Sequence, residues 1–167
     1  MKSFTTSIKI IEKDNDLMKY ACDLATENIL NGNGPFGCII TDFDGNIIST
    51  GVNRVTLDND PTLHAEMVAI KNACKIKNTY KLEDCYIYTS CEPCPMCLSA
   101  IYWSRIKTIF YGNTRQDAKE INFDDSFIYD EINKPIEERS IQMININNKY
   151  AKKSFIEWQK YEKKIEY

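Results

Sequence analysis

Two short segments, residues 64–66 (His-Ala-Glu) and 93–97 (Pro-Cys-Pro-Met-Cys), constrain the fold of this chain more than any other feature. Cysteines three positions apart on the first turn of a helix project to the same side, and an imidazole at the end of a second helix can complete a three-ligand metal site. Prolines are well tolerated where such a helix starts. We therefore expect two helices that bring His64, Cys94 and Cys97 together.

The residue types favour a catalytic zinc centre with one Zn²⁺ per subunit. Structural zinc takes four protein ligands, whereas three ligands leave one position open for water. Two thiolates and a neutral imidazole still acidify that water, so hydroxide is available near neutral pH. Glu66 can reach this water without binding the metal. The pattern is the signature of zinc-dependent nucleobase deaminases, and it predicts zinc-bound hydroxide as nucleophile and Glu66 as proton shuttle.

Other interpretations of the same residues remain open. Cys91, Cys94 and Cys97 form two overlapping C-x-x-C pairs, which could be redox-active, although a thioredoxin-like context is missing. A structural zinc site would need Cys91 as its fourth ligand, because His64 is the only histidine. A zinc-stabilised binding protein without catalysis need not keep Glu66, so the presence of Glu66 favours an enzyme. We interpret Cys91 as a residue that packs beside the site.

Composition narrows the class of protein. A chain of 167 residues, 43% of them hydrophobic and 27% charged, fits one globular domain over residues 1–167. A net charge of -3 offers little attraction to phosphate backbones, so nucleic acid is an unlikely substrate. No segment resembles a signal peptide or a membrane span, and seven cysteines, an odd number, suit reduced thiols. We expect a cytoplasmic protein that does not bind membranes.

Hydrophobic periodicity predicts helices that alternate with strands. Helices are expected over residues 14–30, 64–77, 94–104 and 151–164, and strands over 37–41, 47–52, 85–89 and 107–111. An Asp-Gly pair within residues 42–46 suits a hairpin between the first two strands. Residues 120–138 are acidic and less regular, and the last helix should partly bury Phe155, Ile156 and Trp158. This order predicts an α/β sandwich whose sheet is at least partly parallel.

Several longer segments resemble the guanine deaminases of the cytidine deaminase-like zinc hydrolase superfamily. The metal motifs mark the superfamily, whereas Phe-Asp-Asp-Ser-Phe-Ile-Tyr at 123–129 and the ending Glu-Tyr at 166–167 are similar to guanine deaminases. The resemblance covers nearly the whole chain, in residues 34–37, 51–56, 60–66, 88–97, 100–103 and 123–129. Cys38 departs from the family, which has alanine there, and the C-terminal segment before residue 163 follows the family loosely.

The resemblance implies a three-layer sandwich, with a central five-stranded mixed sheet and helices on both faces. It implies a homodimer that exchanges its C-terminal segments, residues 148–167, so that each covers the partner's site. It also implies hydrolytic removal of the 2-amino group of guanine, which gives xanthine and ammonia. The implied substrate-binding residues are Asn53 and Asp125 as hydrogen-bond partners of the base, Phe36 and Trp103 as pocket walls, and Tyr167 as the closing group.

Alternatives to this function and to these roles share the same scaffold. A tRNA adenosine deaminase has the same metal motifs but should carry a more basic surface. Deamination of guanosine or of an aminotriazine is harder to separate from the sequence. The pocket residues also have purely structural interpretations: Asn53 as a turn residue, Asp125 as a helix cap, Phe36 and Trp103 as core, and Tyr167 as a frayed end.

Overall fold

The computed structural model describes residues 12–146 and 149–166, and the chain divides into two compact units. The first unit ends at Tyr129 and the second begins at Asp130, so the boundary falls within helix α6, Ser126–Asn133. Tyr167, the predicted closing group of the pocket, lies outside the described residues. None of the helices in the described part of the chain has the length and apolarity that crossing a bilayer requires.

The first unit is built on a mixed sheet with the strand order β2-β1-β3-β4. Strands β1 (Gly37–Asp42) and β2 (Ile47–Val52) form the predicted antiparallel hairpin. Its turn contains Gly45 at φ 78°, a left-handed conformation that glycine adopts without strain. Strand β3 (Cys85–Cys91) pairs antiparallel with β1 and parallel with β4 (Ile109–Asn113), so the expected parallel part lies at one edge.

The described residues contain four strands, one fewer than the five that the resemblance implied. After β4 the chain enters helix α5 (Arg115–Glu120) at once, because a capping box starts that helix. In this box the Thr114 hydroxyl accepts from the Asp117 N–H, and the Asp117 carboxylate accepts from the Thr114 N–H. Helix α6 and a 3-10 turn, Ile136–Glu138, follow, so the expectation of an irregular segment at residues 120–138 is also wrong in part.

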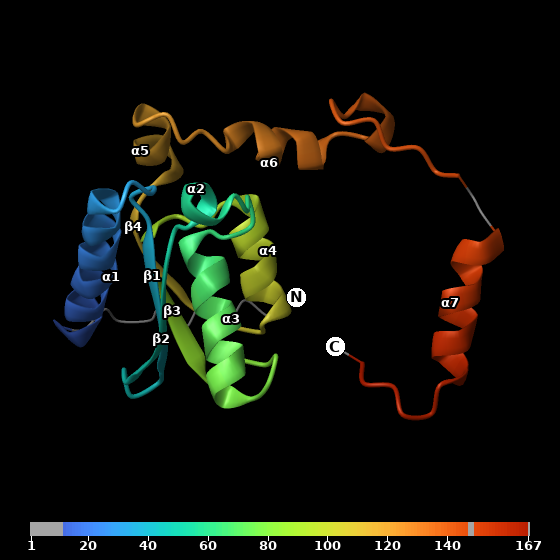
Figure 1. Cartoon of the computed structure of the whole chain (residues 1–167), viewed down its shortest axis with the longest axis horizontal. Coiled ribbons are helices and arrows are strands. Elements are labelled where there is room, and N and C mark those ends of the chain that lie inside the picture. Colours follow the sequence, from blue (N-terminus) through green and yellow to red (C-terminus); the bar gives the residue numbers. More distant parts are fainter. Residues whose placement is uncertain (1–11, 147–148, 167) are drawn as a thin grey trace, which may run out of the picture. The chain divides into compact units, whose positions relative to one another are not determined.

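Helices cover both faces of the sheet, which confirms the predicted three layers (Figure 1). Helix α1 (Glu12–Leu30) packs on one face, against β1, β3 and β4. Helices α3 (Ala65–Lys77) and α4 (Pro95–Trp103) lie side by side on the other face, where α3 contacts β1 and β2. The short helix α2, Val55–Asp58, connects β2 to the segment before α3. The two helices that start at the metal motif therefore share one face.

Alternation of side chains along the strands divides the core into two clusters. Toward α3 and α4 the buried cluster contains Cys38, Ile40, Ala65, Ala69, Ala73, Leu82, Cys85, Ile87, Ile101 and Ile106. Toward α1 it contains Leu17, Ala21, Ile39 and Tyr88. Cys38, the departure from the family, is fully buried in the first cluster, where it acts as a small apolar side chain.

The second unit contains helix α7, Lys149–Lys160. Phe155, Ile156 and Trp158 are exposed there, so the expectation that they are partly buried is wrong for the single chain. A unit of this length cannot build a sizeable core of its own, so an amphipathic helix cannot bury its apolar face within the unit.

Candidate active site

Helices α3 and α4 begin at the predicted metal ligands. His64 is the N-cap residue of α3 and Cys94 that of α4, both with extended backbone and neither with its side chain used as a cap. The Nδ1 atom of His64 lies 3.5 Å from the Sγ atom of Cys94 and 3.6 Å from that of Cys97. The positive ends of the dipoles of α3 and α4 meet at this point, which favours the thiolate form of the two cysteines.

This donor set fits zinc. Zn–S bonds of about 2.3 Å and Zn–N bonds of about 2.0 Å at tetrahedral angles place nitrogen and sulfur about 3.5 Å apart, close to the separations observed. All three ligand atoms lie within 4.8 Å of one another. Cys91 is not part of this group, and its Sγ lies 3.6 Å from the carbonyl oxygen of Thr114. The described residues thus offer three ligands and not the four of a structural zinc site.

The thiols of the group differ in acidity. Hydrogen bonds from Cys97 and His64 lower the pKa of Cys94 to about 4. The hydrogen bond to Cys94, together with burial, raises the pKa of Cys97. Burial raises the pKa of Cys91 to about 11, which keeps this residue a neutral thiol. Of these two cysteines Cys94 loses its proton more readily, and both would bind zinc as thiolates.

Glu66 lies on the first turn of α3, close to the three ligands, and is only 6% exposed. Its Oε1 accepts a hydrogen bond of 3.0 Å from the hydroxyl of Thr89, and its Oε2 lies 3.4 Å from the Sγ of Cys97. Burial raises the pKa of this carboxyl. A carboxyl group held in this way next to a metal site can take up and return a proton.

A cavity of about 830 Å³ opens onto this group. Its lining includes His64, Glu66 and Cys94 together with three of the predicted substrate-binding residues, Phe36, Asn53 and Asp125. Trp103 does not line the cavity in the single chain. It stands at the end of α4, is 59% exposed, and has the guanidinium of Arg105 6.0 Å from its ring centre.

Comparison with known proteins identifies the family. The profile of the cytidine and deoxycytidylate deaminase zinc-binding region matches residues 11–113, which include the three metal-binding residues and Glu66. The chain belongs to the cytidine and deoxycytidylate deaminase family. The presence of this family's zinc-binding region makes zinc the cofactor of the site formed by His64, Cys94 and Cys97.

Three relatives place this deaminase within the family. Guanine deaminase from Bacillus subtilis is 51% identical over 90% of this chain and 96% of its own. The crystal structure of that enzyme matches with a TM-score of 0.89 at 50% identity, over 92% of this chain and 98% of that one. The tRNA-specific adenosine deaminase of Haemophilus influenzae is 40% identical over 60% of this chain and 58% of its own. A structure solved in complex with 2,6-diaminopurine matches with a TM-score of 0.66 at 30% identity, over 70% of this chain and 65% of that one.

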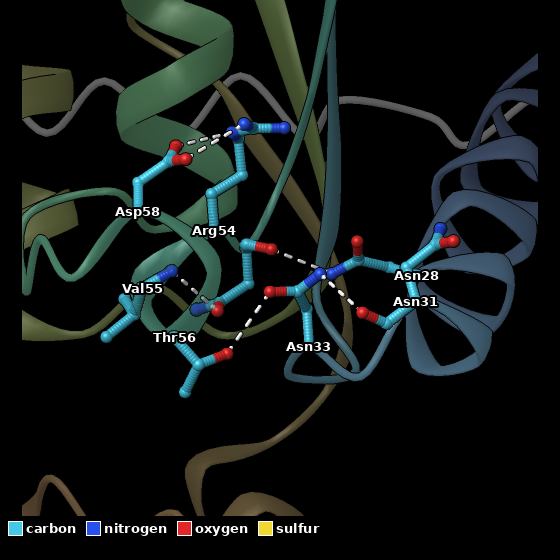
Figure 2. A network of polar contacts seen from close by, with 8 residues as sticks. Asn28, Asn31, Asn33, Arg54, Val55, Thr56 and Asp58 are labelled. Atoms are coloured by element: carbon cyan, nitrogen blue, oxygen red, sulfur yellow. Dashed lines mark hydrogen bonds and ion pairs between the residues drawn. The ribbon is translucent and has the colours of Figure 1, made fainter.

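Hydrogen bonds hold Asn53 in the deaminase, and sequence reasoning missed the side chain that binds its carbonyl oxygen, Asn28, which Figure 2 labels. The buried Asn28 amide donates to the carbonyl oxygens of Asn53 and Gly34, at 2.8 and 2.9 Å. The Oδ1 of Asn53 accepts from the Val55 N–H at 3.3 Å, so its NH₂ group is the end that can donate to a ligand. Asn28 continues the buried stripe of α1 that contains Leu17, Ala21 and Ala25. A polar residue on that stripe was the signal that could have revealed it.

The other side of the cavity is formed by the start of α6 and by an ion pair between Arg115 and Glu92. Asp124, not Asp125, accepts from the Ser126 N–H at the start of α6, at 2.9 Å. The Asp125 carboxylate lines the cavity instead, where burial and the charge of Cys94 raise its pKa. On the rim, Arg115 forms an ion pair with Glu92 and stacks on the Tyr129 ring at 4.3 Å. Asp124 thus makes side-chain hydrogen bonds to Ser126 at the start of α6.

Proposed function

We propose that the protein catalyses the hydrolytic deamination of guanine to xanthine and ammonia. The observation that carries this proposal is the convergence of His64, Cys94, Cys97 and Glu66 on a cavity that also contains Asn53 and Asp125. Similarity to guanine deaminase along nearly the whole length of both chains supports guanine over other bases.

The proton transfers in this reaction are assigned to Glu66. Zinc, when bound to His64, Cys94 and Cys97, supplies the Lewis acidity that lets a water molecule lose a proton near neutral pH. The Glu66 carboxylate accepts that proton as the water oxygen attacks C2 of guanine. It delivers this proton to the neighbouring ring nitrogen, then takes the second proton of the former water from the oxygen now bonded to C2 and delivers that one to the departing amine. The C2–N bond breaks, ammonia leaves, and the water oxygen becomes the 2-oxo group of xanthine.

Two polar residues account for base selection in this proposal. The Asp125 carboxylate can accept from N1–H and the 2-amino group of guanine, and the NH₂ group of Asn53 can donate to an acceptor atom of the same base. Adenine offers no pair of donors on the corresponding edge, and cytosine would leave the cavity partly empty. A ligand that leaves buried polar groups unpaired is rejected strongly, so few contacts suffice for selection.

Completion of the pocket is assigned to a second copy of the chain. We propose a homodimer in which Trp103 and the C-terminal segment, residues 148–167, cover the partner's cavity. The exposure of Trp103 at the end of α4 supports a partner for this surface, and the second unit is too short to bury the apolar side of α7 by itself. A chain lacking Tyr167, mixed with a Glu66→Gln chain, should regain activity, since one site is then complete. Verified subunit exchange without activity would remove Tyr167 from the partner's site.

A cytoplasmic location is part of the proposal. All seven cysteines, each in the described part of the chain, are free thiols, which suits a reducing compartment. A cysteine-rich protein that folds with free thiols and binds zinc through two of them is best maintained where glutathione and thioredoxin keep thiols reduced.

The proposal is tested by a substrate panel. The purified zinc protein is incubated with guanine, guanosine, adenine, cytosine, an aminotriazine and a tRNA anticodon hairpin, and ammonia is measured. Guanine should be the best substrate by kcat/KM. Faster release of ammonia from the hairpin would favour the tRNA adenosine deaminase alternative. A higher kcat/KM for guanosine or the aminotriazine would make that compound, and not guanine, the substrate of the same active site.

A further inference from the structure

A single polar side chain interrupts the apolar face that β3 turns toward α3. Cys85 and Ile87 are buried in the cluster shared with α3, and Thr89 is the next residue on that face, 1% exposed. Strand β3 is hydrogen-bonded on both sides, to β1 and to β4, which fixes the backbone that carries Thr89. The hydroxyl donates to the Oε1 of Glu66 at 3.0 Å.

A buried threonine in this sheet does not need a partner in order to be tolerated. Thr41 on β1 is fully buried, and its Oγ1 has no hydrogen-bond partner among the described residues. The bond from Thr89 to Glu66 is therefore not explained by a general need to satisfy buried hydroxyls. It joins the acidic side chain on the first turn of α3 to a strand that is paired on both sides.

We propose that Thr89 is a positioning residue that anchors Oε1 of Glu66, so that Oε2 is the oxygen that takes and returns the proton. This inference rests on the role of Glu66 in the proposed function. The two carboxylate oxygens have different surroundings, because Oε1 faces Thr89 whereas Oε2 lies 3.4 Å from the Sγ of Cys97, a metal-binding residue. Glu66 also lines the cavity in which the substrate would bind.

The geometry explains why an anchor matters for the reaction. A glutamate side chain has several rotatable bonds, and a carboxylate without a fixed partner can turn and exchange its oxygens. A proton carrier must remain within hydrogen-bond distance of both the water and the substrate nitrogen. A charge-assisted hydrogen bond from a rigid strand keeps one oxygen in place while the other carries the proton.

The test compares three variants of the full-length zinc-loaded protein with the wild type. Thr89→Val keeps the shape of the side chain and removes the hydroxyl, Thr89→Ser keeps the hydroxyl, and Thr41→Val removes a buried hydroxyl that makes no hydrogen bond. The measurements are kcat and KM for guanine, zinc per chain, and the melting temperature. We expect kcat of Thr89→Val to fall roughly tenfold to a hundredfold with KM and zinc nearly unchanged. Thr89→Ser should stay within about threefold of the wild type, and Thr41→Val should match it.

Each of the other outcomes overturns the inference. A Thr89→Val variant that keeps zinc and wild-type kcat shows that Glu66 needs no anchor. A Thr89→Ser variant as slow as Thr89→Val shows that the hydroxyl is not what matters. If Thr89→Val does not fold, Thr89→Ala, which lacks the hydroxyl and cannot clash with Glu66, is judged by the same criteria. A wild-type protein without activity on guanine defeats the proposed function itself, and so is distinguished from a failure of Thr89 alone.

Discussion

Gly51 allows α3 to approach β2 so closely that no side chain fits between them. A Cβ atom added at Gly51 would lie 2.1 Å from the carbonyl oxygen of Ala65 and 2.6 Å from the backbone nitrogen of Ala69. Both atoms belong to the backbone of α3, so rotation of a side chain cannot relieve the contact. The helix that begins at His64 and carries Glu66 would have to move away from the sheet.

The size of this movement sets the expected cost of Gly51→Ala. Relief of the shorter contact to an ordinary distance of about 3.5 Å requires a shift of about 1.4 Å. Overpacking of this kind costs about 3 kcal/mol, and the reduced freedom of the unfolded chain offsets up to about 1 kcal/mol. The net loss of about 2 kcal/mol lowers the melting temperature by roughly 4–8 °C for a chain of this size.

The assay separates loss of stability from loss of the site. Gly37→Ala is the matched control, because its Cβ would lie 2.3 Å from the backbone oxygen of Ala21 on α1, a helix without metal ligands. Both variants should melt at lower temperature. Only Gly51→Ala should also bind zinc more weakly, because it displaces His64 from the residues of α4, and its kcat should fall by roughly a hundredfold as Glu66 moves with the helix.

Two results would refute this reasoning. If Gly51→Ala melts within about 1 °C of the wild type, α3 does not pack as tightly as the structure indicates. If Gly51→Ala and Gly37→Ala lose zinc and kcat to the same extent, the position of α3 on the sheet does not control the site. Zinc per chain and kcat are measured at a temperature where both variants are folded.

Three further predictions concern single side chains. Cys97→Ala should lose zinc and stability together, because ligation and local folding are coupled, and stoichiometric zinc by metal analysis would contradict this. Asp125→Ala should lower kcat/KM for guanine by about 3 kcal/mol of transition-state stabilisation with zinc and melting temperature unchanged; an unaffected kcat/KM would exclude Asp125 from base recognition. Burial and donation to Asp14 at 2.6 Å raise the pKa of Tyr88, so folding favours its protonated form. That contribution to the free energy of unfolding is complete below about pH 10 and is lost as the pH rises further. In urea titrations, Tyr88→Phe should therefore lose less stability than the wild type as the pH is raised above this value.

The parts of the structure that rest on local sequence were predictable. The cysteine spacing, the proline at the start of α4 and the single histidine define a three-ligand site before any tertiary contact is known. The Asp-Gly turn fixes the hairpin, and apolar runs fix the other two strands. The start of α5 was also readable, since Thr114 and Asp117 have the spacing of a capping box.

Residues that act through distant partners were not predictable from their surroundings. Asn28 is a polar residue on the buried stripe of α1 and Thr89 is one on a buried face of β3, and their partners lie 25 and 23 positions away in the chain. Only the packing of α1 and α3 on the sheet brings these pairs together. The burial of Phe155 and Trp158 failed for a different reason, because periodicity shows that a helix has an apolar face but not what covers it.

The central claim is that water replaces the 2-amino group of guanine with the help of Glu66. The most direct measurement is to incubate the zinc-loaded protein with guanine in water enriched in ¹⁸O, with zinc-loaded Glu66→Gln as the control, and to analyse xanthine by mass spectrometry and ammonia by a coupled assay. The account predicts equimolar xanthine and ammonia, one solvent oxygen in each xanthine, and almost no product from the control. Xanthine without the label, ammonia without xanthine, or a control as active as the wild type would contradict it.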